Sequence, residues 1–210
     1  MRKAIIKRNT TETKISLSVN LDGRGYWKPR HRPLAYGRGK SGIRSPIGFL
    51  NHMLNLLARH GLLDLQLKAS GDTEVDIHHT NEDIGICLGL GLKEALGNKE
   101  GIRRFGFASV PLDEALVEVS LDLSGRPYLQ CKVGSLKCKV PGEEYSLNYL
   151  RQFLQALVNN AGITLHVEII SGEDTHHIIE AVFKALGRAL KDAVSIDPRI
   201  KGILSTKGKL

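Results

Sequence analysis

Two copies of the pattern His-His-x-x-Glu are the residues of this sequence best suited to chemistry. Their members are His78, His79 and Glu82 in the first copy, and His176, His177 and Glu180 in the second. On a helix the first histidine and the glutamate share a face, whereas the two adjacent histidines point about 100° apart. We therefore expect two ions, each held by parts of both copies or of neighbouring subunits. Imidazole with one carboxylate suits Mn, Fe, Zn, Co or Ni better than Mg or Ca.

The alternative interpretation of each histidine pair is an exposed helix start, with the glutamate favoured by the helix dipole. A single copy of so short a motif would leave the two interpretations balanced. Two copies at matching places of a repeat favour metal binding. His52, on the preceding predicted helix, offers a further imidazole. Its repeat counterpart is Gln152, so the symmetry of the two copies breaks there.

An internal repeat positions these motifs. Residues 78–96 and 176–194 align with eight identities in nineteen positions. A helix-like hydrophobic pattern and then an alternating segment precede each of them. Self-similarity at this scale indicates duplication. The chain is therefore predicted to hold two half-repeats, 1–98 and 99–210, the second of which ends in a C-terminal tail.

Hydrophobic periodicity predicts the same elements in both halves. Strands are expected at 15–21, 62–69, 116–123 and 163–170, and helices at 49–60, at 147–160 and from 78 and 176 onward. Asp76 and Thr175 are the candidate N-caps of the two long helices. The order β-β-α-β-α, taken twice, predicts an α+β fold. In it, helices pack on mixed four-stranded sheets, an arrangement similar to the second domain of a ribosomal protein.

Composition and charge limit the class of protein. Hydrophobic residues make up 41% and charged residues 25% of the 210 positions, which is typical of a folded globular chain. No apolar run approaches the ~20 residues that span a bilayer, so we expect no membrane partner. Three cysteines without CxxC spacing argue against a disulfide framework and favour a cytoplasmic protein. The net charge of +8 favours an anionic partner.

The densest basic stretch, Lys28–Arg44, lies in a Gly/Pro-rich loop predicted at 24–46. Aromatic residues are only 5% of the chain, and no nucleic-acid-binding module is recognisable, so we expect a small anion rather than a nucleic acid. The run GRGKSG at 37–42 resembles the end of a phosphate-binding loop. The first glycine of that motif would fall at Leu34, however, and Pro46 interrupts the helix that should follow.

Segments along nearly the whole chain resemble the imidazoleglycerol-phosphate dehydratase family of histidine biosynthesis. They lie at 11–25, 48–65, 70–89, 101–116, 123–128, 164–190 and 205–208, in the order of the family. The resemblance implies a metal-dependent hydro-lyase that converts imidazole glycerol phosphate to imidazole acetol phosphate. It also implies two Mn(II) ions per active site and a homo-oligomer of about 24 subunits with active sites between subunits.

The resemblance implies roles residue by residue. The metal ligands are His52, His78, His79, Glu82, His176, His177 and Glu180. The residues that bind the substrate's phosphate are Arg104, Arg126, Lys184, Ser205 and Lys207. Glu12 and His60 match positions beside the substrate's hydroxyls and ring and join Glu180 as catalytic residues. Proton transfer stays open between Glu180, Glu12 and a metal-bound water.

Three positions depart from the pattern of the family, beside a longer and more basic loop at 26–40. Asn51 stands where an aspartate is usual, and a carboxylate that would orient His52 is thereby lost. Pro46 stands where a glycine is usual, and Gln152 stands where many members have a histidine. Gln152 therefore changes one expected ligand of one site.

Two other functions compete with the dehydratase. An RNA-binding module of ribosomal-protein type would use Lys28–Arg44 and hold a structural metal through its histidines. It predicts nucleic-acid binding that weakens steeply with salt, and no turnover. A dinuclear metal hydrolase is the third class, and no nucleophile motif supports it.

Overall fold

The computed structural model describes residues 2–25, 42–132, 139–142, 144–208 and 210. Most of the predicted loop at 24–46 lies outside these residues, including nearly all of the GRGKSG run. The segment Lys28–Arg44, on which the RNA-binding alternative depends, also lies almost wholly outside them.

Both halves of the described chain repeat one order of elements. The first half holds β1 (Lys3–Asn9), β2 (Thr13–Asn20), β3 (Ile43–Arg44), α1 (Gly48–Gly61), β4 (Asp64–Gly71) and α2 (His78–Leu96). The second holds β5 (Phe105–Leu112), β6 (Ala115–Asp122), β7 (Tyr128–Lys132), α3 (Leu147–Ala161), β8 (Thr164–Ser171) and α4 (Thr175–Val194). The predicted order β-β-α-β-α lacked the third strand of each half. That strand escapes detection because β3 has two residues and β7 shows no alternation of burial.

The two sheets are mixed and four-stranded, as the sequence predicts. Their strand orders are β1-β2-β4-β3 and β5-β6-β8-β7. All neighbours are antiparallel except β3 with β4 and β7 with β8, which are parallel. Alternation along β2 turns Ile15, Leu17 and Val19 into the core. The same alternation along β6 buries Val117 and Val119, because successive side chains of a strand point to opposite faces.

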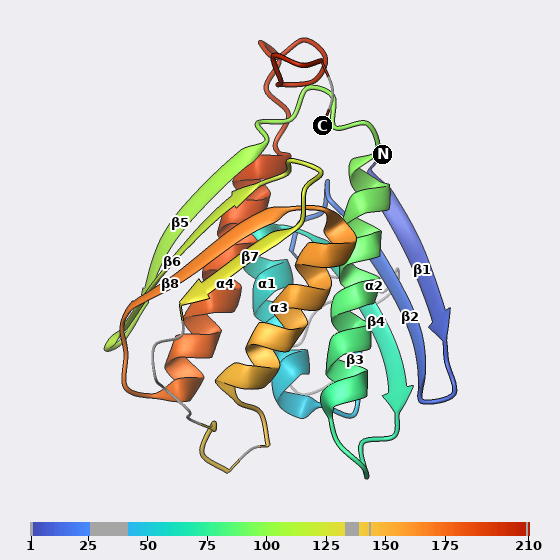
Figure 1. Cartoon of the computed structure of the whole chain (residues 1–210), viewed down its shortest axis with the longest axis vertical. Helices are drawn as coiled ribbons and strands as arrows, with labels where there is room; N and C mark the ends of the chain where they lie inside the picture. Colours follow the sequence, from blue (N-terminus) through green and yellow to red (C-terminus); the bar gives the residue numbers. More distant parts are fainter. Residues whose placement is uncertain (1, 26–41, 133–138, 143, 209) are drawn as a thin grey trace.

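The four helices lie between the two sheets (Figure 1). Helix α1 packs against α4, and α2 packs against α3, so each helix pair joins the two halves. One hydrophobic core runs through both halves. Glycines permit the close approach: a Cβ on Gly187 would lie 2.6 Å from the carbonyl oxygen of Leu57, and one on Gly89 would lie 2.6 Å from that of Leu157.

The starts of α2 and α4 carry the histidine pairs, and their caps differ from the prediction by one residue. Asp174, not Thr175, is the N-cap of α4, and its side chain accepts a hydrogen bond from the His176 N–H. Ile77 is the N-cap of α2, although the Asp76 carboxylate still accepts from the backbone N–H two residues on. Among the described residues, no helix has both the length and the apolarity that crossing a membrane requires.

Candidate metal and substrate site

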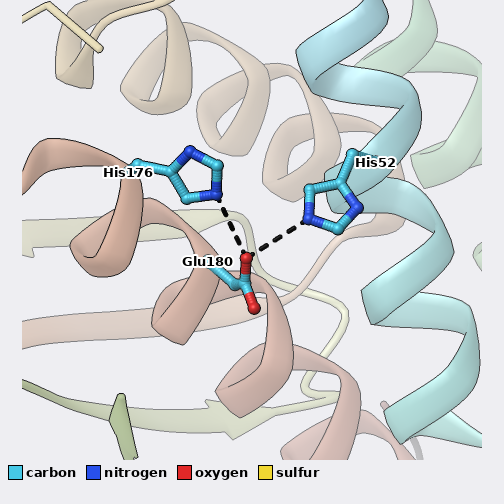
Figure 2. A group of neighbouring side chains, drawn as sticks. All are labelled: His52, His176 and Glu180. Carbon is cyan, nitrogen blue, oxygen red and sulfur yellow. Dashed lines mark hydrogen bonds and ion pairs between the residues drawn. The ribbon is translucent and has the colours of Figure 1, made fainter. Parts of the chain in front are cut away.

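One group of possible metal ligands lies where α1 packs against α4. Nε2 of His52 and Nε2 of His176 lie 3.2 Å and 3.3 Å from the same oxygen, Oε2 of Glu180 (Figure 2). One ligand atom from each residue lies within 4.8 Å of the other two. Two imidazole nitrogens that converge on one carboxylate oxygen fit a divalent transition ion better than Mg or Ca.

Lys184 and His60 add a positive charge and a third imidazole beside this group. Nζ of Lys184 lies 2.7 Å from Oε1 of Glu180, and the lysine side chain is only 17% exposed. Burial, the largest single influence, raises the pKa of Glu180, but the hydrogen bonds and charges of Lys184 and His52 together outweigh it, and the pKa is lowered. Burial and the nearby charge of Lys184 lower the pKa of His60. Its imidazole is therefore neutral at pH 7 and can accept a proton.

The first histidine pair diverges at the start of α2. Nε2 of His78 lies 3.2 Å from Oε2 of Glu82, one helical turn on. His79 turns the other way, and its Nδ1 lies 3.1 Å from Asp72 and 3.6 Å from Glu12. These three residues form a second possible ligand group, and the hydrogen bond with Asp72 raises the pKa of His79. The predicted divergence of adjacent histidines is thus seen in the structure.

The second pair repeats this divergence at the start of α4. His176 faces Glu180, whereas Nδ1 of His177 lies 2.8 Å from Oε2 of Glu114. That contact raises the pKa of His177 and, with backbone N–H donors, lowers the pKa of Glu114 to about 2. Glu114 was not among the site residues predicted from the sequence. Extending the repeat alignment to the turn between β5 and β6 would have found it, because Glu114 occupies there the place that Glu12 has between β1 and β2.

We call His79 and His177, the second member of each pair, the outer histidines. In both of them, Nδ1 lies within hydrogen-bond distance of a carboxylate oxygen. A hydrogen bond at one ring nitrogen fixes the tautomer and orients the other nitrogen toward a metal ion. Each outer histidine is therefore prepared to present Nε2 away from the glutamate of its own helix. This arrangement fits ions that take ligands from more than one helix start.

Two of the predicted phosphate-binding residues share a carboxylate, Asp122. Arg104 bonds it through Nε at 2.7 Å and Nη2 at 3.0 Å, and Arg126 approaches it at 4.0 Å. Nη1 of Arg104 donates to the carbonyl oxygen of Leu204, which places the tail with Ser205 beside these arginines. All three guanidinium nitrogens of Arg104 thus bond the protein. Arg126 is 69% exposed and keeps donors for an anion.

These arginines and the tail lie at the opposite end of α4 from the candidate metal ligands. The N–H of Arg104 donates to the carbonyl oxygen of Ala193, near the C-terminal end of the helix, whereas Glu180 lies near its start. At 1.5 Å per residue the two positions on α4 are about 20 Å apart. Of the predicted phosphate-binding residues, all of which the structure describes, only Lys184 lies beside the ligands. Within one chain, the other predicted phosphate-binding residues therefore do not lie beside the candidate metal ligands.

Two polar residues next to the motifs bond neighbouring parts of the fold. Asn51, expected to affect His52, instead donates to the carbonyl oxygen of Ser45 and accepts from its hydroxyl, both at 2.8 Å. A carboxylate could not make the first of these bonds. Asp83, which directly follows Glu82, contacts Thr13 and Arg8 on the neighbouring hairpin. Both side chains therefore fix the backbone that carries the site.

The chain has a duplicated α+β fold, and matched histidine and glutamate groups lie at the starts of two helices. These features define a class of protein with two candidate metal sites, one in each half. Comparison with known proteins narrows this class. A family model described as imidazoleglycerol-phosphate dehydratase matches residues 45–190. Relatives with the same name from Acetivibrio thermocellus and Geobacter metallireducens are 53% and 51% identical over 209 residues, covering 100% of this chain and 99% of each relative. The chain belongs to the imidazoleglycerol-phosphate dehydratase family.

Solved structures agree with this assignment. The crystal structure of the dehydratase from Staphylococcus aureus matches with a TM-score of 0.75 at 35% identity, over 93% of this chain and 99% of its own. The structure of the enzyme from Pyrococcus furiosus matches with a TM-score of 0.77 at 35% identity, over 98% of this chain and 100% of its own. The similarity therefore extends through both half-repeats.

Proposed function

We propose that this chain is a metal-dependent hydro-lyase that converts imidazole glycerol phosphate to imidazole acetol phosphate in histidine biosynthesis, in the cytoplasm. Membership of the family supports the dehydration reaction. The convergence of His52, His176 and Glu180 is the single observation that carries metal dependence. Two matched helix starts support two ions per active site, with Mn(II) as the expected metal.

Dehydration requires a base for a C–H proton and an acid for the departing hydroxyl. Divalent ions held by the two histidine–glutamate groups would supply positive charge that stabilises the electron-rich ring of the substrate. Glu180 already bonds His52, His176 and Lys184, so its oxygens are engaged in holding the site. Glu12 is an exposed carboxylate on a hairpin turn. We therefore favour Glu12 over Glu180 for proton transfer.

The active site is proposed to form between subunits of a homo-oligomer. Arg104, which shares Asp122 with Arg126 and bonds the tail at Leu204, contacts Ala193, about 20 Å along α4 from Glu180 and too far for one small substrate to contact both. A second copy can bring its arginine and tail to the ligands of the first. Closed symmetry favours a discrete particle, and the family resemblance points to 24 subunits.

Metal content and turnover test the function directly. Elemental analysis of the purified chain should give about two transition ions per subunit, and Mn(II) should support turnover of imidazole glycerol phosphate. His79→Ala and His177→Ala should each lose metal and turnover. His166→Ala is the matched control, because His166 is exposed on β8 outside both ligand groups. Full metal occupancy in both ligand variants would contradict the assignment.

A further inference from the structure

The two helix pairs cross in the same way. A Cβ on Gly187 would meet the Leu57 carbonyl oxygen at 2.6 Å and the Gly61 nitrogen at 3.0 Å. A Cβ on Gly89 would meet the Leu157 carbonyl oxygen at 2.6 Å and the Ala161 nitrogen at 3.0 Å in the other pair. The pair α2 and α3 therefore matches the pair α4 and α1, and each residue of one pair has a counterpart in the other.

Counting from these crossing points places Gln152 where the other pair has His52. His52 lies five residues before Leu57 on α1, and Gln152 lies five residues before Leu157 on α3. The partner helices match as well: His78 and Glu82 precede Gly89 by the same eleven and seven residues as His176 and Glu180 precede Gly187. The two histidine–glutamate contacts are alike too, at 3.2 Å and 3.3 Å.

Gln152 carries an oxygen that lacks a partner. Its Oε1 is buried, and no hydrogen bond to it exists among the described residues. Buried polar atoms are nearly always hydrogen-bonded. A buried acceptor without a hydrogen-bond donor therefore suggests a partner that is absent from the protein itself, such as a metal ion. An amide oxygen has two lone pairs and no charge, and it is a harder and weaker donor to transition ions than imidazole.

We propose that the two metal positions of the chain are unequal. One position uses His52, His176 and Glu180 and binds its ion tightly. The other uses His78, Glu82 and the amide oxygen of Gln152, and binds a second ion at least about tenfold more weakly because a hard amide oxygen replaces an imidazole nitrogen. The inference rests on the proposed metal-dependent function and adds to it an order of ion binding.

The test is a titration of chelator-treated full-length protein with Mn(II), with free Mn(II) followed by electron paramagnetic resonance. Wild type should show a tight and a weak class of site that differ at least about tenfold in Kd. Gln152→His should bring the two classes together, and Gln152→Leu should abolish the weak class while the tight class remains. Gln155→Leu is the matched control, because Gln155 lies exposed on the same helix.

The outcomes separate this inference from the function on which it rests. Two equal sites in wild type, or a weak class that persists in Gln152→Leu, would overturn the inequality and leave the metal-dependent function intact. Absence of any Mn(II) binding in wild type would overturn both. The Gln152→His variant keeps the test decisive if Gln152→Leu fails to fold, because it must strengthen the weak class.

Discussion

Asp83 is a buried carboxylate one residue after Glu82 and four after His79, on the side of α2 that faces the β1–β2 hairpin. It accepts a hydrogen bond from the Thr13 hydroxyl at 2.5 Å and lies 2.9 Å from Nε of Arg8. Arg8 and Thr13 belong to the β1–β2 hairpin, whose turn carries Glu12. A single side chain therefore ties the helix with the histidine pair to the hairpin with the favoured proton-transfer group.

Replacing Asp83 with asparagine should destabilise the protein and slow turnover. The amide keeps the shape but not the charge that faces Arg8, and losing a hydrogen-bonded charged partner at a buried position costs about 1–3 kcal/mol. Denaturant unfolding measures the first effect and kcat the second. Asp22→Asn is the control, since its exposed pair with Arg2 is worth about 1 kcal/mol or less. Equal losses in both variants would show that Asp83 has no special role.

At the scale of elements, the crossing of α1 and α4 decides whether His52 reaches Glu180. The two residues are 128 positions apart and meet only because the helices pack closely at Gly187. A methyl group at Gly187 must displace backbone of α1, since its nearest neighbour would be a carbonyl oxygen at 2.6 Å.

Gly187→Ala should therefore lower both stability and metal affinity. Overpacking a tight contact costs about 1–3 kcal/mol, and displacement of α1 moves His52 away from Glu180. Thermal unfolding and Mn(II) titration measure the two effects. Gly48→Ala is the control: Gly48 lies at the start of α1, a Cβ there would have nothing within 4 Å, and the variant should stay within about 0.5 kcal/mol of wild type. A Gly187→Ala protein with unchanged Mn(II) affinity would separate helix packing from the site.

At the scale of the whole molecule, the position of Arg126 at the far end of α4 predicts complementation between chains. Glu180→Gln and Arg126→Ala should each give poor enzymes alone. Coexpressed, they should form mixed oligomers with up to about a quarter of wild-type activity, because some sites take an intact Glu180 from one chain and an intact Arg126 from another. Activity measured at low substrate concentration shows the recovery.

The control for complementation is the chain that carries both substitutions, expressed alone. Its oligomers should stay inactive. Mixed oligomers no more active than the average of the two single variants would mean that each site takes both residues from one chain.

Assembly should also depend on metal. An ion that binds only the assembled form must, by linkage, favour that form. Light scattering should show a fall in mass after chelation and recovery with Mn(II), but not with Ca²⁺, which prefers oxygen ligands. One unchanged mass in metal-free and Mn(II)-loaded protein, with activity still following the metal, would show that the ion serves chemistry alone.

The sequence by itself determined the elements with long, regular hydrophobic patterns. The helices from 78 and 176 and the strands around 15–21 and 116–123 follow from periodicity, which depends on near neighbours in the chain. The divergence of adjacent histidines was predictable for the same reason, since it follows from helix geometry. Short strands such as β3, and the exact cap residues, were not, because neither has a pattern long enough to detect.

Only the tertiary structure decided which residues meet. The contact of His52 with Glu180, the pairing of His177 with Glu114 and the anchoring of Asp83 on the first hairpin all join residues distant in sequence. The separation of the arginines from the candidate metal ligands likewise comes from tertiary packing, which places the two groups at opposite ends of α4. Periodicity encodes which face of an element is buried, but the partner on that face depends on how helices from two halves cross, and no local pattern contains that information.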